Sequence, residues 1–204
     1  MNSRSLGYWL KVRLSKGYKQ TIYHFVFDVK FDLRHKARLV TDGNWTDVVC
    51  DNTYLGVVRM DTVRTGFTLG DLNGLKFCAQ DVGNAYLNSY TKEKIYIVAG
   101  PEFGPALAGR ILIIVKALYG LRTSAARFHE HLTDTLRKLG FSPSKAEPNM
   151  FYKDASDHYE YIAMYVDDIL VWSRNPMRIM KLLMANYTMD WVSLSIILVA
   201  MWSS

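Results

Sequence analysis

The chain has 204 residues, of which half are hydrophobic and 13% are aromatic. Charged residues are interspersed among them, which is typical of globular proteins and excludes the disordered and fibrous classes. Its 25 basic and 19 acidic residues give a net charge of +6. This balance favours a polyanionic partner such as nucleic acid but does not identify one.

Cysteine usage and the apolar segments bear on the cellular setting. Cys50 and Cys78 have no CxxC spacing, so neither a zinc site nor a disulfide framework is predicted, and a reducing, intracellular setting is expected. Residues Met1–Leu14 contain no continuous apolar run, so they predict no secretion signal or membrane anchor. Val192–Trp202 is apolar but shorter than the ~20 residues of a spanning helix, so a buried strand or helix is expected there.

The first predicted elements are a hairpin, a helix and a strand. Tyr23–Leu33 alternates apolar and polar residues, the pattern of a half-buried strand, and it pairs with Lys36–Thr41 to give a hairpin with a basic edge. Asp61 is expected to cap a helix that stops at Gly74. The strand Leu75–Asp81 follows, which places an aspartate where a strand ends.

Further along the chain, Lys94–Ala99 and Ile111–Ala117 flank a loop rich in Gly and Pro and predict a second strand pair. Ser124 is expected to be the N-cap of a helix that Gly140 closes, because apolar residues recur there at helical spacing.

The last predicted hairpin carries two acids at its tip. Tyr159–Tyr165 and Ile169–Trp172 are short apolar runs on either side of Val166, Asp167 and Asp168. Strands and helices follow one another in a mixed rather than a regularly alternating order. The expected fold class is therefore α+β.

Two adjacent carboxylates between apolar strands repel each other unless a cation neutralises them, so Asp167 and Asp168 indicate a metal site. Mg²⁺ prefers oxygen ligands, and paired metals can clamp both oxygens of a phosphoryl transfer. The alternative is a simple turn, because Asp is a favoured turn residue.

Longer motifs distinguish these alternatives. The string YEYIAMYVDDILVWS contains YVDD at Tyr165–Asp168, DVGNAYL occupies Asp81–Leu87, and KALYGLRTS occupies Lys116–Ser124. In this order the three motifs resemble the reverse transcriptase of copia-type retrotransposons. The segments Phe27–Gly43, Tyr90–Gly104 and Lys145–Tyr152 also look like copia-type polymerase sequence, so the resemblance covers about Gln20–Leu183.

The resemblance implies the fingers and palm of a right-hand polymerase, with an antiparallel palm sheet and packed helices. It implies that Asp81, Asp167 and Asp168 hold two Mg²⁺ ions, or Mn²⁺ in their place, for in-line nucleotidyl transfer. The implied partners are an RNA or DNA template-primer and deoxynucleoside triphosphates, and no membrane.

The resemblance also implies nucleotide-binding residues. Tyr86 would lie beneath the sugar and exclude a 2′-hydroxyl, Lys36 or Arg38 would grip the triphosphate, and Gly120 and Arg122 belong to the nucleotide-pocket motif. Without the resemblance, a core role is the expected one for Tyr86, and for the two cations the alternative is a solvated strand edge.

Two histidines near the start of the last long helix, His129 and His131, have a spacing that argues against a shared metal. Residues two apart on a helix point to different faces, so solvated or packing roles are expected.

The expected organisation is an N-terminal segment (1–19), a fingers-like region (20–80), a palm (81–175) and a divergent tail (176–204). Thumb and ribonuclease H sequences are not recognised, so a fragment with impaired activity is expected. A noncatalytic nucleic-acid-binding remnant and a nonfunctional relic are the alternatives. The expected location is cytoplasmic, in a virus-like particle for the intact element, or nuclear.

Overall fold

A computed structural model describes residues 9–10, 16–29, 33–43 and 58–191. The chain forms two compact units, each built from two separate segments. One unit combines Met1–Tyr54 with Tyr86–Phe128, and the other combines Leu55–Ala85 with His129–Ser204. Each unit is discontinuous because strands distant in sequence pair with one another. The division into an N-terminal segment, a fingers-like region, a palm and a tail stays a prediction. The expected α+β class is confirmed by mixed helices and mainly antiparallel sheets.

The first unit contains a small four-stranded sheet in the order β1-β7-β6-β2. Its strands are β1 (Trp9–Leu10), β2 (Lys19–Gln20), β6 (Ile95–Val98) and β7 (Ile111–Ile114). The antiparallel pair β6–β7 confirms the predicted strand pair, and β2 runs parallel to β6. The core of this unit is formed by Ile95, Ile97, Ala99, Phe103, Leu112, Ile114, Leu118 and Leu121.

The predicted hairpin of the first unit is present as β3 (Tyr23–Val29) and β4 (His35–Thr41). The expectation that its first strand is half-buried is wrong, because every described β3 residue after Tyr23 is exposed. Phe27 is 78% exposed. These strands form a sheet of two strands, and alternation along a strand does not reveal whether another layer covers its apolar face.

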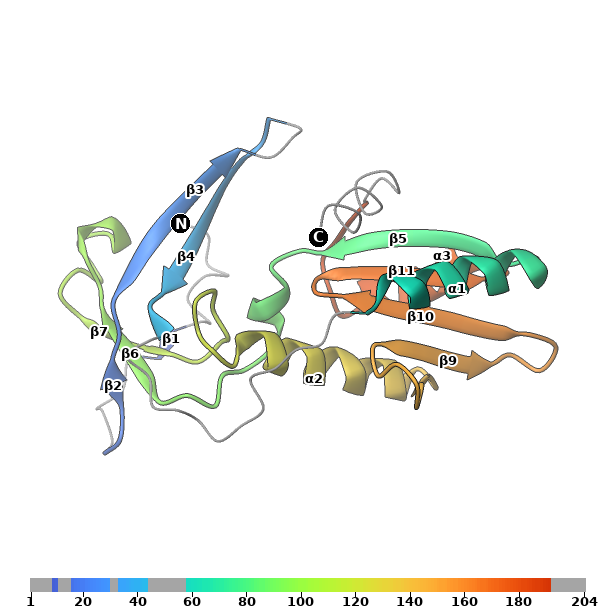
Figure 1. Cartoon of the computed structure of the whole chain (residues 1–204). Helices are drawn as coiled ribbons and strands as arrows, with labels where there is room; N and C mark the ends of the chain where they lie inside the picture. The colour runs from blue at the N-terminus through green and yellow to red at the C-terminus, as the bar shows by residue number, and fades with distance from the viewer. Residues whose placement is uncertain (1–8, 11–15, 30–32, 44–57, 192–204) are drawn as a thin grey trace. The chain divides into compact units, whose positions relative to one another are not determined.

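The second unit is built on a six-stranded antiparallel sheet in the order β12-β5-β11-β10-β9-β8 (Figure 1). Its strands are β5 (Lys76–Val82), β8 (Ser142–Pro143), β9 (Met150–Asp154), β10 (Tyr159–Tyr165), β11 (Asp168–Ser173) and β12 (Met189–Trp191). The hairpin β10–β11 matches the prediction almost residue for residue. The strand pair β5–β11 joins segments that are far apart in the chain.

Helix α1 (Met60–Leu72) packs against β5 and β11 through Trp172. Added β-carbons at Gly66 and Gly70 would lie only 3.0 Å and 2.9 Å from the Trp172 ring. Phe67 and Phe77 complete this contact, with ring centroids 5.3 Å from that of Trp172. Two helical glycines thus let the helix approach the indole closely.

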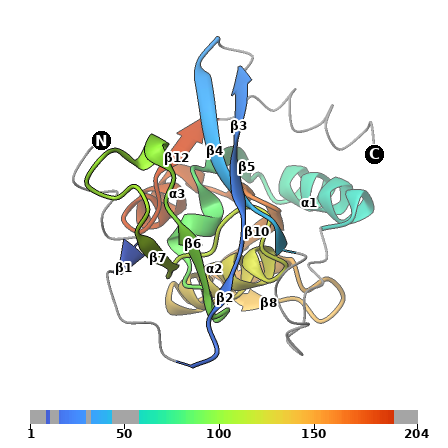
Figure 2. The same ribbon diagram turned by 90° about the vertical axis from the view of Figure 1, so that its left-hand side faces the viewer.

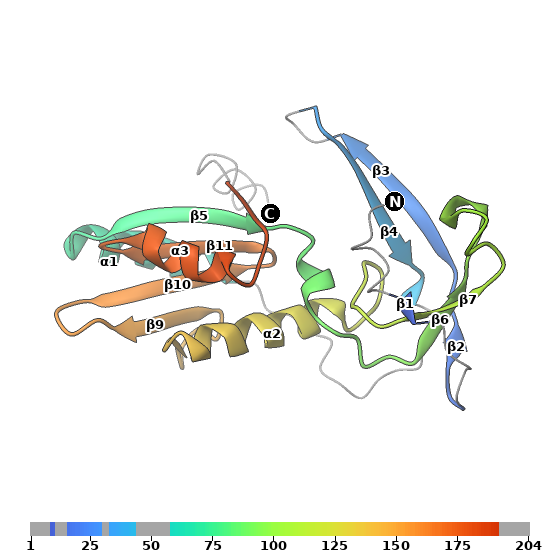
Figure 3. The ribbon, with the colours of Figure 1, turned by 180° about the vertical axis from the view of Figure 1, so that it is seen from behind.

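Helix α2 (Ser124–Lys138) begins in the first unit and continues in the second. Helix α3 (Pro176–Met184) contacts β5 and β11, as Figure 3 shows from behind. Arg178 of α3 donates two hydrogen bonds, of 2.8 and 2.9 Å, to the buried carboxylate of Glu160 on β10, and Ser173 donates a third. Burial raises the pKa of Glu160, but these hydrogen bonds outweigh burial and lower the pKa below its usual value.

Both predicted N-caps need correction. Helix α1 is preceded by Arg59, whose side chain makes no capping bond, and Asp61 lies inside the first turn beside Arg64 at 3.2 Å. Ser124 is already helical, and its hydroxyl donates to the Leu118 carbonyl at 2.6 Å. The predicted stop at Gly74 fits, because its positive φ of 61° follows directly after the C-cap.

Among the described residues, no helix combines the length and apolarity that crossing a membrane requires. Cys78 is buried with a free thiol. The segment Val192–Trp202 and Cys50 lie outside the described residues. The expected location stays a prediction.

Candidate metal centre and nucleotide-contacting residues

The structure places Asp81, Asp167 and Asp168 at the same end of the second unit's sheet. Asp81 on β5 lies directly opposite Asp168 on β11. The Val82 amide donates a 2.8 Å hydrogen bond to the Asp167 carbonyl. Residues opposite each other in an antiparallel pair share a face and have Cα atoms ~4.5–5.5 Å apart. The carboxylates of Asp81 and Asp168 therefore project from the same face.

Apolar neighbours fix this register. Phe77 and Ala79 precede Asp81 on the same face of β5, and they lie opposite Trp172 and Leu170 of β11. These residues belong to the core packed beneath α1. A slip of one residue would turn the whole row to the other face. The hydrophobic row therefore aligns the two acids, and the hairpin tip extends beyond α1 (Figure 1).

The turn that carries Asp167 has an unusual backbone. Tyr165 pairs with Asp168, so Val166 and Asp167 make the connection. Val166 has a φ of 56°, a left-handed conformation that β-branched residues rarely adopt. Such backbone strain persists where the surroundings enforce it, and it is common at functional sites. Here the hydrogen bond from Val82 to Asp167 holds the turn against β5.

The electrostatics of the cluster favour binding of a cation. Burial, followed by the nearby charges of Asp167 and Asp81, raises the pKa of Asp168 to about 7. A metal-free site therefore retains a proton up to near neutral pH. Carboxylate oxygens are the ligands that Mg²⁺ prefers, so the donor atoms and charge suit this ion. Within the described residues, however, no three His, Cys, Asp or Glu side chains converge closely enough to hold a metal.

A fourth acid lies beside the cluster and was not predicted. Asp190 of β12 is directly opposite Asp81, and the neighbouring Gly83 amide donates to the Thr188 carbonyl at 2.8 Å. Sequence patterns contain no signal for β12, because a strand of three residues is too short to display alternation.

In the first unit, Tyr119 connects Arg38 and Tyr86. The Arg38 guanidinium carbon lies 5.8 Å from the centre of the Tyr119 ring, a cation–π contact. Tyr86 packs against the same ring, with ring centroids 4.7 Å apart, and against the Phe128 ring, with centroids 6.5 Å apart. The sequence did not single out Tyr119, although it stands beside Gly120 in the KALYGLRTS motif.

Gly120 allows this arrangement by a close approach to β4. Its φ is 91°, and an added β-carbon would lie 1.7 Å from the Thr41 carbonyl oxygen. The Thr41 amide donates to the Tyr119 carbonyl at 2.9 Å. The close approach at Gly120 is therefore between two backbone segments, and it sets Tyr119 beside Arg38. Arg122, two residues further on, is exposed.

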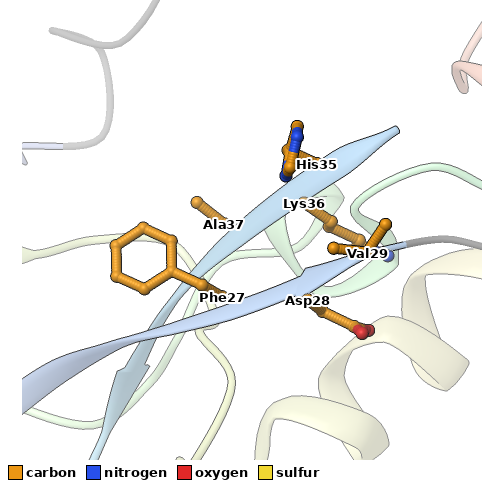
Figure 4. A pocket seen from close by; sticks show the side chains of 6 residues that line it. All are labelled: Phe27, Asp28, Val29, His35, Lys36 and Ala37. Carbon is orange, nitrogen blue, oxygen red and sulfur yellow. The ribbon is translucent and has the colours of Figure 1, made fainter. Parts of the chain in front are cut away.

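Lys36 and Arg38 occupy the same face of the hairpin and share an acidic neighbour. Lys36 lies opposite Asp28 in the strand pairing, and Arg38 contacts the Asp28 carboxylate at 3.4 Å. A hollow of about 440 Å³ lies on this hairpin. Figure 4 shows the six side chains that line it, namely Phe27, Asp28, Val29, His35, Lys36 and Ala37.

The candidate residues thus fall into two groups. The three aspartates belong to the second unit, and Lys36, Arg38, Tyr86, Gly120 and Arg122 belong to the first. Within its own unit each group has the contacts described above.

The two histidines have packing partners. His129 Nε2 lies 2.7 Å from Asn149 Oδ1, and His131 packs edge-on against Tyr187 with ring centroids 5.7 Å apart. The expected packing roles are confirmed.

Comparisons with known proteins agree on one family. A family profile described as "Reverse transcriptase (RNA-dependent DNA polymerase)" matches residues 7–195. A transposon Ty5-1 protein from Saccharomyces cerevisiae is 35% identical over 97 residues, which cover 47% of this chain and 32% of that protein. A Pol polyprotein from transposon TNT 1-94 of Nicotiana tabacum is 28% identical over 187 residues, covering 86% of this chain and 14% of the polyprotein.

A Ty1-BL Gag-Pol polyprotein from Saccharomyces cerevisiae is 29% identical over 157 residues, covering 74% of this chain and 8% of the polyprotein. The chain therefore spans about a third or less of the length of these relatives. Among solved structures, a foamy viral protease-reverse transcriptase in complex with double-stranded DNA has a TM-score of 0.50 and 18% identity. The match covers 92% of this chain and 28% of that one, and supports the fold alone.

Proposed function

This chain belongs to the reverse transcriptase (RNA-dependent DNA polymerase) family, and on that premise we propose that Asp81, Asp167 and Asp168 form a two-metal site for nucleotidyl transfer. The relatives place the chain in the reverse transcriptase region of Ty1/copia-type Pol polyproteins. The observation that carries the proposal is the direct pairing of Asp81 with Asp168 at a hairpin tip tied to β5.

The aspartates act as ligands in this proposal. Two Mg²⁺ ions, when bound, would activate the primer 3′-hydroxyl and neutralise the triphosphate. Asp81 and Asp168 are oriented by paired strands, whereas Asp167 is presented by a strained turn. Asp168 must release its proton to bind a cation, because its pKa is about 7 without one. Binding of Mg²⁺ should therefore be accompanied by proton release near neutral pH.

We further propose that the first unit supplies nucleotide contacts. Arg38, held by the Tyr119 ring and the Asp28 carboxylate, is suited to pair with phosphate oxygens, and Lys36 adds a second cation. Tyr86 would contact the sugar and select deoxynucleotides. Gly120 supports this group by positioning Tyr119, and Arg122 is an exposed additional cation.

Primer extension tests the proposal. The purified chain is supplied with an RNA or DNA template, an annealed DNA primer, deoxynucleotides and Mg²⁺ or Mn²⁺. We expect slow, metal-dependent extension, as for a fragment with impaired activity, and a further reduction of at least about a hundredfold in Asp167→Asn, since metal-based charge stabilisation contributes several kcal/mol. Asp154→Asn, at an exposed position on β9, is the control of equal charge change.

A binding measurement complements the activity assay. Mg²⁺ should raise the midpoint of thermal unfolding of the wild type, because a ligand that binds the folded state stabilises it. The rise should be lost in Asp167→Asn. Undiminished extension by that variant would refute the catalytic assignment. Template-primer binding with neither extension nor a metal-dependent shift would favour a noncatalytic nucleic-acid-binding role.

A further inference from the structure

Another hollow lies within the second unit, beside helix α1. The helix contacts β5 and β11, and the sheet continues past these strands through β10, β9 and β8. In the view of Figure 2 the helix lies above β8. The hollow has a volume of about 430 Å³, which is in the range of sites that hold small organic molecules.

The floor of this hollow is aromatic. Tyr161 of β10 lies opposite Tyr152 of β9 on one side and opposite Trp172 of β11 on the other. Residues directly opposite each other share a face of the sheet, so both tyrosine rings project from the face on which α1 packs against Trp172. Both tyrosines line the hollow, and Tyr152 is 42% exposed. A ligand would therefore meet aromatic rings beneath it.

Helix α1 provides one wall. Thr62, Thr65 and Leu69 line the hollow, and their spacing of three and four residues places them on one face of the helix. The wall thus combines short polar side chains with the hydrocarbon of a leucine. It is suited to the apolar body of a ligand rather than to a charged group.

The other wall contains a buried carboxylate. Glu147, between β8 and β9, lines the hollow and is only 8% exposed. It accepts hydrogen bonds from the backbone amides of Asn149 at 3.3 Å and Arg59 at 3.4 Å, and both are longer than the ~2.7–3.2 Å of an ordinary N–H···O bond. The Arg59 Nε lies 3.9 Å away, on a side chain that is 82% exposed. The carboxylate therefore has room for a further, stronger donor.

The chemistry of the hollow selects a ligand of positive charge. A buried carboxylate with only long contacts is costly, and a charged donor that reaches it removes part of this cost. The faces of tyrosine rings also attract cations. The solvated guanidinium of Arg59 competes weakly, because ion pairs with an exposed partner contribute little.

We propose that this site, the Glu147 hollow lined by Thr62, Thr65, Leu69, Glu147, Tyr152 and Tyr161, binds a small organic cation. An ammonium or guanidinium group of the ligand donates to the Glu147 carboxylate, and its apolar body lies over the tyrosine rings and against Leu69. The hollow includes neither the aspartate cluster nor the nucleotide-contacting candidates. Its occupancy therefore stands or falls separately from the proposed catalytic function.

Three probes that share a phenyl body and differ in charge test the proposal. Binding of 2-phenylethylamine, 2-phenylethanol and 3-phenylpropionate to the full chain is followed by amide NMR, with EDTA present. The amine should bind roughly tenfold more tightly than the alcohol, because a hydrogen bond between charged groups is the main difference between them. The propionate should bind most weakly. Equal affinities of the amine and the alcohol would overturn recognition of charge.

Two substitutions test the carboxylate. Glu147→Gln keeps the size and an acceptor oxygen but removes the charge, so the amine should bind no more tightly than the alcohol. Glu130→Gln removes the same charge at an exposed position of α2 and should leave the preference unchanged. Arg59→Gln removes the competing cation and should tighten binding of the amine about twofold. Weaker amine binding in Arg59→Gln, or equal losses in both glutamate variants, would contradict the proposal.

The location is tested at two matched threonines of α1. Thr65 and Thr68 are both exposed, and each hydroxyl donates to the carbonyl four residues earlier, at 2.7 and 3.1 Å. Only Thr65 lines the hollow. Thr65→Phe should fill it and weaken binding of the amine at least about tenfold, whereas Thr68→Phe should have little effect. Equal affinities of the two phenylalanine variants for the amine would place the ligand elsewhere and overturn the proposal.

Discussion

The charged form of Asp168 is disfavoured in the folded protein, since burial and two acidic neighbours raise its pKa to about 7. In the unfolded chain an aspartate titrates near ~3.9. The folded state therefore binds the proton more tightly. The stability that this group contributes is fully present below the unfolded pKa and is lost as pH rises through the folded pKa.

We expect Asp168→Asn to stabilise the metal-free protein by about 1–2 kcal/mol at pH 8. Each pKa unit corresponds to about 1.4 kcal/mol, and solvent screening of the partly exposed carboxyl reduces the total. The gain should shrink towards zero near pH 4. Urea unfolding in EDTA at both pH values measures it. Asp71→Asn, at an exposed site in the last turn of α1, is the control, and an unchanged Asp168→Asn stability at pH 8 would contradict the assignment.

A second residue-scale prediction concerns Gly120. Its alanine variant would place a methyl group 1.7 Å from the Thr41 carbonyl oxygen at a φ of 91°. We expect the free energy of unfolding to fall by about 3 kcal/mol or more. The backbone must move to relieve the collision, and alanine is also strained at this φ. Gly104→Ala is the matched control, since φ is 83° there but nothing lies within 4 Å of the added carbon. It should cost only about 1 kcal/mol, and equal losses of stability in the two variants would show that the collision is relieved without cost.

At the scale of elements, the packing of α1 on Trp172 can be tested directly. Gly70→Ala would improve helix propensity by about 1 kcal/mol, yet the new methyl group would lie 2.9 Å from the indole ring. Overpacking of a core typically costs ~1–3 kcal/mol, so we expect a net loss of stability in chemical denaturation. Thr68→Ala, at an exposed position of the same helix, should be close to neutral. A stabilised Gly70→Ala variant would mean that the helix can move away from Trp172.

Elements were predictable where a local pattern and its packing agree. Strands β10 and β11 are short apolar runs on either side of a turn, and most of their residues are buried, so their bounds followed from the sequence. Strand β3 instead alternates apolar and polar residues but lacks cover in the described structure, so its burial was misjudged. The Asp61 cap failed for a different reason: the N-cap is Arg59, two residues before Asp61, and an acid in the first turn is favourable without capping.

The candidate site shows the same division. The candidate role of the three aspartates came from YVDD and DVGNAYL, which are contiguous motifs whose context is specific, and the structure adds that Asp81 pairs with Asp168. Asp190 and Tyr119 were not, since their significance depends on which backbone lies opposite them. A strand of three residues, such as β12, is too short to show an alternating pattern, so its cross-strand partners cannot be predicted from the sequence.

At the scale of the whole molecule, the second unit is built from two separate segments of the chain. A fragment that contains only one of these segments should therefore not fold cooperatively. Residues 129–204 contain most of the second unit but lack β5, which lies between β12 and β11 in the sheet. We expect this fragment to unfold without cooperativity in a thermal melt followed by circular dichroism, since two unpaired strand edges would be exposed. Joining residues 58–85 to 129–191 through a flexible linker should restore a cooperative transition. Cooperative unfolding of the shorter fragment would show that β5 is dispensable.

The pairing of β5 with β11 also affects when the second unit can fold during synthesis. On the ribosome the chain emerges at about 5–20 residues per second, so Asp81 leaves the exit tunnel several seconds before Asp168 can reach it. Throughout that interval β5, with its buried residues Cys78, Ala79 and Gln80, has none of its sheet neighbours. Folding of the second unit is thus delayed until nearly the whole described chain has been made, and during this delay the nascent strand is open to chaperones and to aggregation.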